Sequence, residues 1–160
     1  MNVHYFNLNR LCLLVIIAFL VGALAGCEYR VPITRRPTRN IDTRLIGNWV
    51  SNENLSLKIR SLNETTYIVS YSGVLFEAYH SDVSGVPFLT VQELETSHRS
   101  YTYLTYSVSA DGNKLYLRLV NDQVIPRETE STAMVQELLN QNLQNPGLLL
   151  HQDEFTKLPE

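Results

Sequence analysis

Polar and apolar residues alternate with a period of two over much of the chain after residue 45. The segment NLSLKIR shows the pattern well, because Leu55, Leu57 and Ile59 are each followed by a serine, a lysine or an arginine. Such alternation is typical of an antiparallel strand that buries one face and leaves the other in water. It therefore predicts that the main body of the protein is built from a sheet.

Seven segments within 75 residues have the features of strands. Turn residues separate them, with Ser72-Gly73 as a tight hairpin turn and Asp111-Gly112-Asn113 before the last one. This spacing predicts a meandering barrel or sandwich, and it argues against parallel strands joined by helices. The segments are IGNWV, NLSLKIR, TTYIVSY, GVLFEAYH, VPFLTV, SYTYLTYSVS and KLYLRLV.

A helical pattern follows these strands and ends at Asn145-Pro146-Gly147. We expect this helix to pack on the outside of the barrel or to cap one of its ends. The segment LLLHQDEF then predicts a short last strand. The predicted fold class is mostly β, a small antiparallel up-and-down barrel of about seven or eight strands with one helix near the C-terminus. The apolar residues of the helix are Met134, Val135, Leu138, Leu139 and Leu143.

The first 26 residues form a separate segment. Leu11 to Ala25 is a run of 15 residues without a charge, and Arg10 precedes it. As a helix this run would be about 22 Å long, which is shorter than the ~30 Å hydrocarbon core of a bilayer. That length favours a secretory signal peptide over residues 1–26, and an uncleaved N-terminal anchor is the alternative.

The apolar run ends in Leu24-Ala25-Gly26-Cys27, which resembles the lipobox of bacterial lipoprotein precursors. The resemblance implies that a peptidase cuts before Cys27, that its thiol carries a diacylglyceryl group as a thioether, and that its new amine is acylated. Two or three acyl chains would hold the protein on a membrane. Cys12 would be lost with the signal peptide, so the mature chain would have one lipidated cysteine and no disulfide.

The residues after this cysteine bear on location and on the linker. Glu28 stands where an aspartate favours the inner membrane in enteric-type bacteria. The resemblance thus favours the outer membrane facing the periplasm, with the inner membrane and the cell surface as alternatives. Pro32 and Pro37 disfavour helix, and few large apolar residues are available for burial. We therefore expect residues 27–42 to form a flexible basic tether and residues 43–160 to form one barrel domain.

Charge is unevenly distributed along the chain. Residues 27–40 contain four arginines against one acid, a net charge of +3. Residues 41–160 contain 8 Lys and Arg against 15 Asp and Glu, a net charge of −7. A body this acidic would repel a phosphate backbone, so we exclude nucleic acid as a partner. The arginines of the tether could lie on anionic lipid headgroups or be solvated.

Gly47-Asn48-Trp49, in the first strand segment, resembles the G-x-W motif of the lipocalins and related calycin barrels. The predicted order of strands, helix and last strand is similar to theirs. The stretch also resembles small lipocalin-like lipoproteins of Bacteria whose function is not established. The resemblance implies that Trp49 closes the floor of the barrel, that close packing requires Gly47, and that Arg118 lies over the indole ring.

Patterns for catalysis and metal binding are absent from the mature sequence. His80, His98 and His151 are far apart, and no two fall at metal-ligand spacing. Glu93, Glu95 and His98 could form a metal or acid–base cluster, but a solvated acidic loop explains them better. No serine lies in a nucleophile elbow, and no glycine-rich loop could hold phosphates. We therefore predict no enzymatic activity, no catalytic residues, no metal and no cofactor.

Three of the nine tyrosines are candidates for contact with a ligand or a partner. Tyr101 and Tyr103 share one face of a strand segment, and Tyr106 points the other way. Such amphipathic rings line pockets and interfaces, although they are also ordinary strand formers. The sequence thus predicts a membrane-anchored envelope lipoprotein that binds a small amphipathic or hydrophobic ligand in or on its barrel. The alternative is a protein-interaction module, such as a hydrolase inhibitor or an accessory factor of an envelope assembly.

Overall fold

The computed structural model describes residues 28–96 and 99–159. The signal peptide, the lipobox residues Leu24, Ala25, Gly26 and Cys27, and His98 lie outside the described residues. Within the described ranges, no helix is both long and apolar enough to cross a bilayer.

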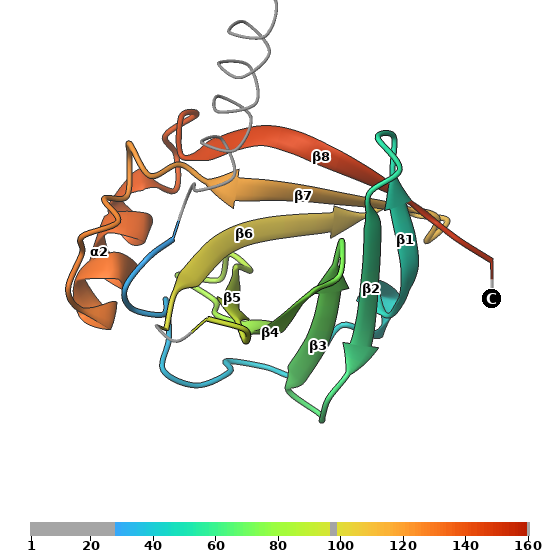
Figure 1. Cartoon of the computed structure of the whole chain (residues 1–160). Helices are drawn as coiled ribbons and strands as arrows, with labels where there is room; N and C mark the ends of the chain where they lie inside the picture. Colours follow the sequence, from blue (N-terminus) through green and yellow to red (C-terminus); the bar gives the residue numbers. More distant parts are fainter. Residues whose placement is uncertain (1–27, 97–98, 160) are drawn as a thin grey trace, which may run out of the picture.

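Eight antiparallel strands form a closed barrel (Figure 1). Each strand pairs with its neighbours in the sequence, and β1 pairs with β8 to close the sheet. This confirms the predicted fold class, an up-and-down barrel with one α-helix near the C-terminus in the part of the chain that is described. The strands are β1 (Gly47–Ser51), β2 (Ser56–Ser61), β3 (Thr66–Tyr71), β4 (Val74–His80), β5 (Leu89–Glu93), β6 (Tyr101–Val108), β7 (Lys114–Val120) and β8 (Leu149–Lys157).

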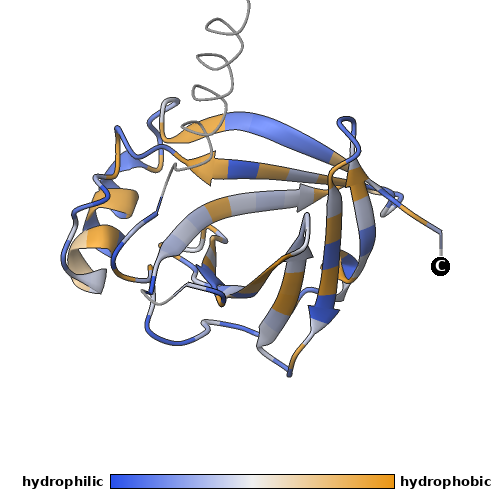
Figure 2. Cartoon of the chain, in the orientation of Figure 1, coloured by the Kyte–Doolittle hydropathy of each residue, from blue (hydrophilic) through white to orange (hydrophobic). Residues whose placement is uncertain are grey.

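The period-two pattern decides which face of a strand is buried. In β2, Leu57 and Ile59 are buried while their neighbours are exposed, and Figure 2 shows this alternation as stripes of colour along the strand. Ser72 and Gly73 both have positive φ, 50° and 95°, as the two-residue turn between β3 and β4 requires. The local pattern and the turn chemistry therefore agree with the barrel.

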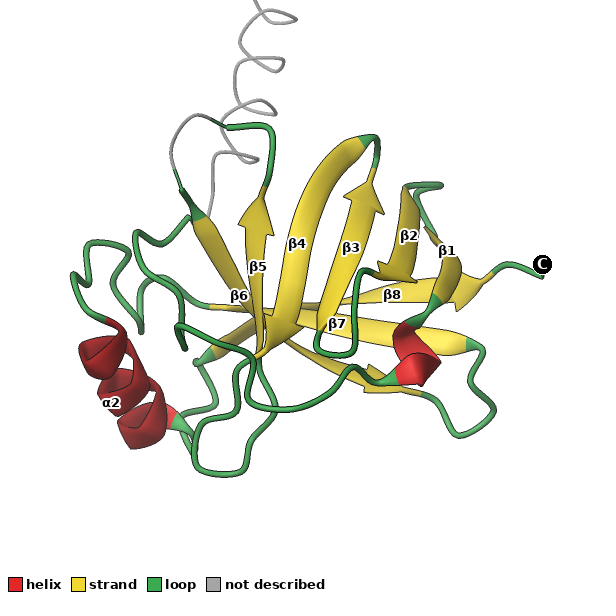
Figure 3. Cartoon of the chain, turned by 90° about the horizontal axis from the view of Figure 1, so that it is seen from below, coloured by secondary structure: helices red, strands yellow, loops and turns green. Residues whose placement is uncertain are grey.

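Successive connections between strands alternate between the two ends of the barrel, and the last of them carries the α-helix away from the β3–β4 turn (Figure 3). One end holds the short 3-10 helix η1 (Thr43–Leu45), and we call it the η1 end. We call the opposite end the rim. The η1 end contains the connections 62–65, 81–88 and 109–113, and the described connections of the rim are 52–55, 72–73, 94–96, 99–100 and 121–148.

Two clusters of buried side chains form the core. The inner cluster lies inside the barrel and includes Trp49, Leu57 and Leu115. The outer cluster lies between the barrel wall and the elements packed outside it, and Phe88 and Tyr103 belong to it. The barrel is therefore buried on part of its outer surface as well as inside.

The helix α2 (Thr132–Asn142) packs on the outside of the barrel, one of the two predicted positions (Figure 1). Val135 and Leu139 are fully buried there. Met134, which the sequence also assigns to the packed face, is instead 52% exposed. Ser131 caps the helix by accepting a hydrogen bond from the backbone N–H of Met134 at 3.2 Å.

Residues 28–42 are not the flexible tether that the sequence predicts. They run along the barrel from the rim to the η1 end, and we call them the strap. Tyr29 and Ile33 are buried in the outer cluster, and Tyr29 exchanges two backbone hydrogen bonds with Tyr101. The physical reason is that Tyr29, Val31 and Ile33 alternate as in a strand, a signal that the neighbouring prolines and arginines obscure. The strap is thus part of the folded domain.

Candidate functional site

Trp49 closes the η1 end of the barrel. Its side chain is fully buried, and its indole N–H donates to the carbonyl of Leu45 in η1 at 2.9 Å. The ammonium of Lys157 lies 5.1 Å from the centroid of the ring. A cation at this distance from an indole face is attracted by the ring quadrupole. Three elements, η1, β1 and β8, therefore meet at this one side chain.

Arg118 does not have the position that the lipocalin resemblance implies. Its guanidinium donates to the backbone carbonyls of Leu149 and Leu150, at 3.0 and 3.1 Å. Lys157 provides the cation at Trp49 instead, because closure of the barrel makes these two residues cross-strand partners. Sequence reasoning misses Lys157, since no local pattern links the last residue of β8 to β1.

Gly47 makes room for this contact. Its φ of +153° is in a range that favours glycine. A Cβ at this position would lie 2.7 Å from Cε of Lys157 and 3.5 Å from Nε1 of Trp49. The absence of a side chain therefore lets the lysine reach the ring, in keeping with the close packing that the resemblance implies.

His80 is a buried polar residue at the same end of the barrel. A guanidinium nitrogen of Arg39 lies 3.2 Å from His80 Nδ1. Because a guanidinium can only donate, Nδ1 accepts, and the ring proton is on Nε2, which donates to the hydroxyl of Tyr67 at 2.9 Å. Burial, and then the charge of Arg39, lower the pKa of His80 to about 4, so its ring is neutral at pH 7.

The hydroxyl of Tyr67 joins this histidine to the strap. It accepts a hydrogen bond from the backbone N–H of Asp42, and burial raises the pKa of Tyr67 to about 12. The carboxylate of Asp42 accepts hydrogen bonds from Tyr106 at 3.2 Å and from Arg44, and the bond from Arg44 is the main cause of its lowered pKa. These contacts hold the strap across the η1 end, so protein groups close it.

A pocket of about 500 Å³ lies between the strap and the end of β6. Arg39 and Arg44 line it, but each has an internal partner. Arg44 pairs with Asp42 at 2.6 Å, and Arg39 pairs with Asp82 at 3.6 Å. The pocket therefore has little unbalanced positive charge with which to bind an anion.

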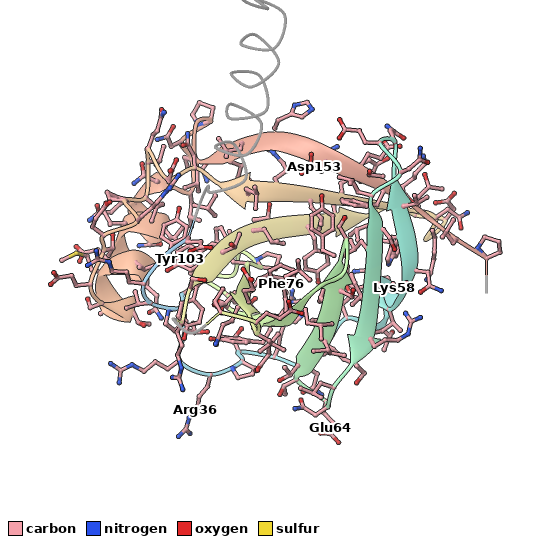
Figure 4. All side chains as sticks on the ribbon, viewed as in Figure 1. Arg36, Lys58, Glu64, Phe76, Tyr103 and Asp153 are labelled. Atoms are coloured by element: carbon pink, nitrogen blue, oxygen red, sulfur yellow. The ribbon has the colours of Figure 1, made fainter. Side chains whose placement is uncertain are left out.

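Inward-facing side chains of the inner cluster keep part of their surface exposed toward the rim. Five of them are partly exposed, as are Tyr106 and Val108 beside the strap, whereas Trp49 and Leu115 are fully buried. Phe76 in β4 is on the same inward face and is also half-buried, and Figure 4 shows it within the ring of strands. These inward-facing side chains therefore leave part of their apolar surface exposed to solvent. The five residues are Val69, Tyr71, Val91, Leu104 and Leu117.

Two carboxylates also lie on the inward face of the rim half. Glu93 pairs in register with Phe76, and Asp153 pairs with Leu117. Burial, followed by the charge of Asp153, raises the pKa of Tyr71. Among the described strand residues of the rim half, the inward positions hold no lysine or arginine. This part of the barrel therefore suits a polar group that is neutral or cationic better than a carboxylate or a phosphate.

The three candidate tyrosines divide between the two clusters. Tyr101 and Tyr103 are buried in the outer cluster, and the ring of Tyr103 stacks on Tyr29 with centroids 3.9 Å apart. Figure 4 shows Tyr103 on the side of α2. Both residues hold the strap and are not exposed to a ligand. Tyr106 points the other way, as predicted, but its hydroxyl is bound to Asp42.

Sequence reasoning also does not identify the inward-facing residues of the rim half as a candidate site. Its signal is present, because Val69 and Tyr71 occupy alternate positions of β3. In β6, however, Tyr101 and Tyr103 make one apolar face and Leu104 belongs to the other. Alternation shows that a strand has two faces, but it does not show which of two apolar faces is enclosed.

The other polar candidates do not assemble into a centre. His80 is buried at the η1 end, and His151 is exposed in β8. Glu95 is exposed in the connection after β5. Among residues 28–96 and 99–159, no three His, Cys, Asp or Glu side chains are placed to hold a metal ion.

Comparison of this chain with known protein families, with curated proteins and with solved structures finds no match. The structure itself defines the class of protein, a small barrel of eight antiparallel strands. Trp49, η1 and the strap pack across one end, and inward-facing apolar side chains are partly exposed toward the other. Function must therefore follow from the residues of the barrel.

Proposed function

We propose that this protein is a lipid-anchored lipoprotein of the bacterial envelope whose barrel binds a small amphipathic molecule. The observation that carries the proposal is the asymmetry of the barrel. Trp49 and the strap pack across the η1 end, while side chains such as Val69 and Tyr71 keep apolar surface partly exposed toward the rim. A hydrophobic tail would bury that surface. An eight-stranded barrel is just wide enough to hold one small ligand.

The carboxylates of the rim half define the polar end of this ligand. Glu93 and Asp153 lie on the inward face, and no lysine or arginine balances them at the inward positions described there. We therefore expect a neutral, zwitterionic or cationic head group. A fatty acid with the same chain length should bind more weakly, because its carboxylate would be repelled.

Two sequence features support the rest of the proposal. The lipobox before Cys27 supports an acyl anchor, with the outer membrane facing the periplasm as the favoured location and the inner membrane or cell surface as alternatives. The G-x-W motif at Gly47 and Trp49, together with the up-and-down topology, supports a lipocalin-like barrel. The proposed role is binding, with no catalytic step and no cofactor.

Native mass spectrometry tests whether a ligand is carried. The sample is a water-soluble form, residues 27–160 with Cys27→Ser, exported through a cleavable signal and purified from the envelope of its own cells. The strap is kept because Tyr29 and Ile33 pack on the barrel. The expected result is a protein with the added mass of one small amphiphile, which organic solvent removes.

A matched pair of variants tests where the ligand binds. Val69→Trp fills the inward face of β3, and Ser70→Trp places the same ring on the outward face of the same strand. Calorimetric titration with dodecyltrimethylammonium should show a loss of about tenfold in affinity or more, roughly 1.4 kcal/mol, for Val69→Trp only. Dodecanoate should bind the wild type more weakly. Equal binding by all three proteins, or no bound molecule, would favour the protein-interaction module instead.

A further inference from the structure

We infer that the rim of the barrel faces the membrane that holds the acyl chains, so that a ligand passes between the bilayer and the barrel. This inference rests on the anchor at Cys27 in the proposed function and adds a partner surface to it, the lipid bilayer itself. Three features carry it: the fixed position of Tyr29, the short chain before it, and an exposed apolar pair at the rim.

Tyr29 is fixed to the rim by its backbone and by its ring. Its N–H donates to the carbonyl of Tyr101 at 2.6 Å, and its carbonyl accepts from the N–H of Tyr101 at 2.9 Å. Its ring is buried and stacks on Tyr103. Tyr101 is the first residue of β6, which begins at the rim. The described chain therefore starts at the rim and not at the η1 end.

Only two peptide units separate Cys27 from Tyr29. They span at most about 7 Å, whereas a flexible tether of about 15 residues would span about 20 Å on average and leave the barrel free to turn. A strand such as β7, with 7 residues, is about 23 Å long. Acyl chains on Cys27 can therefore enter a bilayer beside the rim, but they cannot reach one beside the η1 end.

An exposed apolar pair lies at the same end. Leu75 and Leu94 are 41% and 45% exposed, and the N–H of Leu94 donates to the carbonyl of Leu75 at 3.0 Å. Gln92 pairs with Tyr101, so Leu94 is two strand spacings across and two residues along from Tyr29, and Leu75 is one strand further; the pair is roughly 12–16 Å from Tyr29. Figure 3 shows the β3–β4 turn, the end of β5 and the start of β6 on one side of the barrel. The two leucines can enter the bilayer once the anchor holds the rim there.

Charge does not drive this contact. Glu93 and Glu95 flank Leu94 and offset the exposed Arg30 and Arg99 at the same end, so an anionic bilayer would exert little net attraction on the rim. The acyl chains and the two leucines must hold it, and the contact should therefore be insensitive to salt.

Fluorescence quenching in vesicles tests the orientation. The full mature protein with its lipid is reconstituted in vesicles of phosphatidylethanolamine and phosphatidylglycerol that contain a nitroxide-labelled lipid. Leu94→Cys carries a fluorophore at the rim, and Glu64→Cys carries it at the η1 end, where Figure 4 shows Glu64 exposed between β2 and β3. The thiol of Cys27 is consumed by the thioether and takes no label. We expect quenching to be several-fold stronger at position 94, at low and at high salt.

The outcomes separate this inference from the proposed function. Equal quenching at both positions, or stronger quenching at 64, overturns the orientation if mass spectrometry shows the acyl chains in place. The ligand proposal would then stand, because the Val69→Trp and Ser70→Trp measurements use no bilayer. A Cys27 without lipid overturns both the anchor and the orientation.

A linker insertion tests whether the strap sets the orientation. A Gly-Ser segment of about 15 residues between Glu28 and Tyr29 would separate the acyl chains from the rim without altering the packed part of the strap. The difference in quenching between positions 94 and 64 should then largely disappear. If it persists unchanged, the short connection is not what orients the barrel and the inference is wrong.

Discussion

The ammonium of Lys157, in the last residue of β8, lies 5.1 Å from the centroid of the Trp49 ring in β1. The two residues are direct cross-strand partners, because β8 closes the barrel against β1. Gly47 lies against both side chains and has no Cβ to separate them. This contact therefore joins the two ends of the sheet at the closed floor of the barrel.

A double-mutant cycle between Lys157→Met and Trp49→Phe should show a coupling energy of about 1 kcal/mol in urea unfolding, as expected for a partly desolvated cation over a ring. The control cycle combines Arg118→Met with Trp49→Phe. It should be additive within about 0.5 kcal/mol, since Arg118 bonds to carbonyls of β8 instead. Coupling at Arg118 and none at Lys157 would contradict the structure.

Gly47→Ala should lower the free energy of unfolding by about 1–3 kcal/mol, because alanine is strained at a φ of +153°. The new Cβ would also press on Cε of Lys157. Measuring the same substitution in a Lys157→Ala background removes this contact and leaves the backbone strain. Gly47→Ala should still lower the free energy of unfolding in the Lys157→Ala background. If the substitution has no effect in either background, the backbone at Gly47 is not strained.

The lowered pKa of His80 predicts a dependence of stability on pH. The ring has a pKa of about 4 in the folded protein against 6.5 as its ordinary value, so the unfolded chain binds a proton first as the pH falls. This stabilising contribution is complete above about pH 6.5 and is lost by about pH 4, a change of about 3 kcal/mol. His80→Gln lacks the titration, so the stability difference between wild type and variant should decline over this range. A constant difference would rule out a buried neutral histidine.

Tyr29→Ala should destabilise the water-soluble form by about 3–5 kcal/mol, because the ring is buried against Tyr103. Its exposed neighbour provides the control, and Arg30→Ala should change the free energy of unfolding by less than about 0.5 kcal/mol. Denaturant titration measures both. If neither variant changes the free energy of unfolding, residues 28–42 do not pack on the barrel and form the flexible tether that the sequence predicts.

In α2, Leu139→Ala should cost about 2–5 kcal/mol because its side chain is fully buried against the barrel. Met134→Ala, on the exposed face of the same helix, should cost less than about 0.5 kcal/mol. Thermal unfolding of the two variants compares them directly. If both variants are destabilised equally, α2 does not pack on the barrel through the face that contains Leu139.

Local sequence is sufficient for the strands, the tight turn and the helix. Leu57 and Ile59 alternate with polar neighbours, and Ser72-Gly73 has the residues of a two-residue turn, so both features can be predicted before any tertiary contact is known. Periodicity and turn chemistry act over a few residues, which is why they predict an antiparallel barrel. The lipobox is equally local, and lipidation of Cys27 stays a prediction.

Tertiary structure alone decides which distant residues meet. Trp49 receives its cation from Lys157 and not from Arg118, because the register of all eight strands determines the partner that closure brings to β1. The strap is held by the contact of Tyr29 with Tyr101, two residues far apart in the chain that no periodic pattern connects. The closed floor, the packed strap and the accessible rim therefore depend on barrel closure, a property of the whole sheet that no short segment contains.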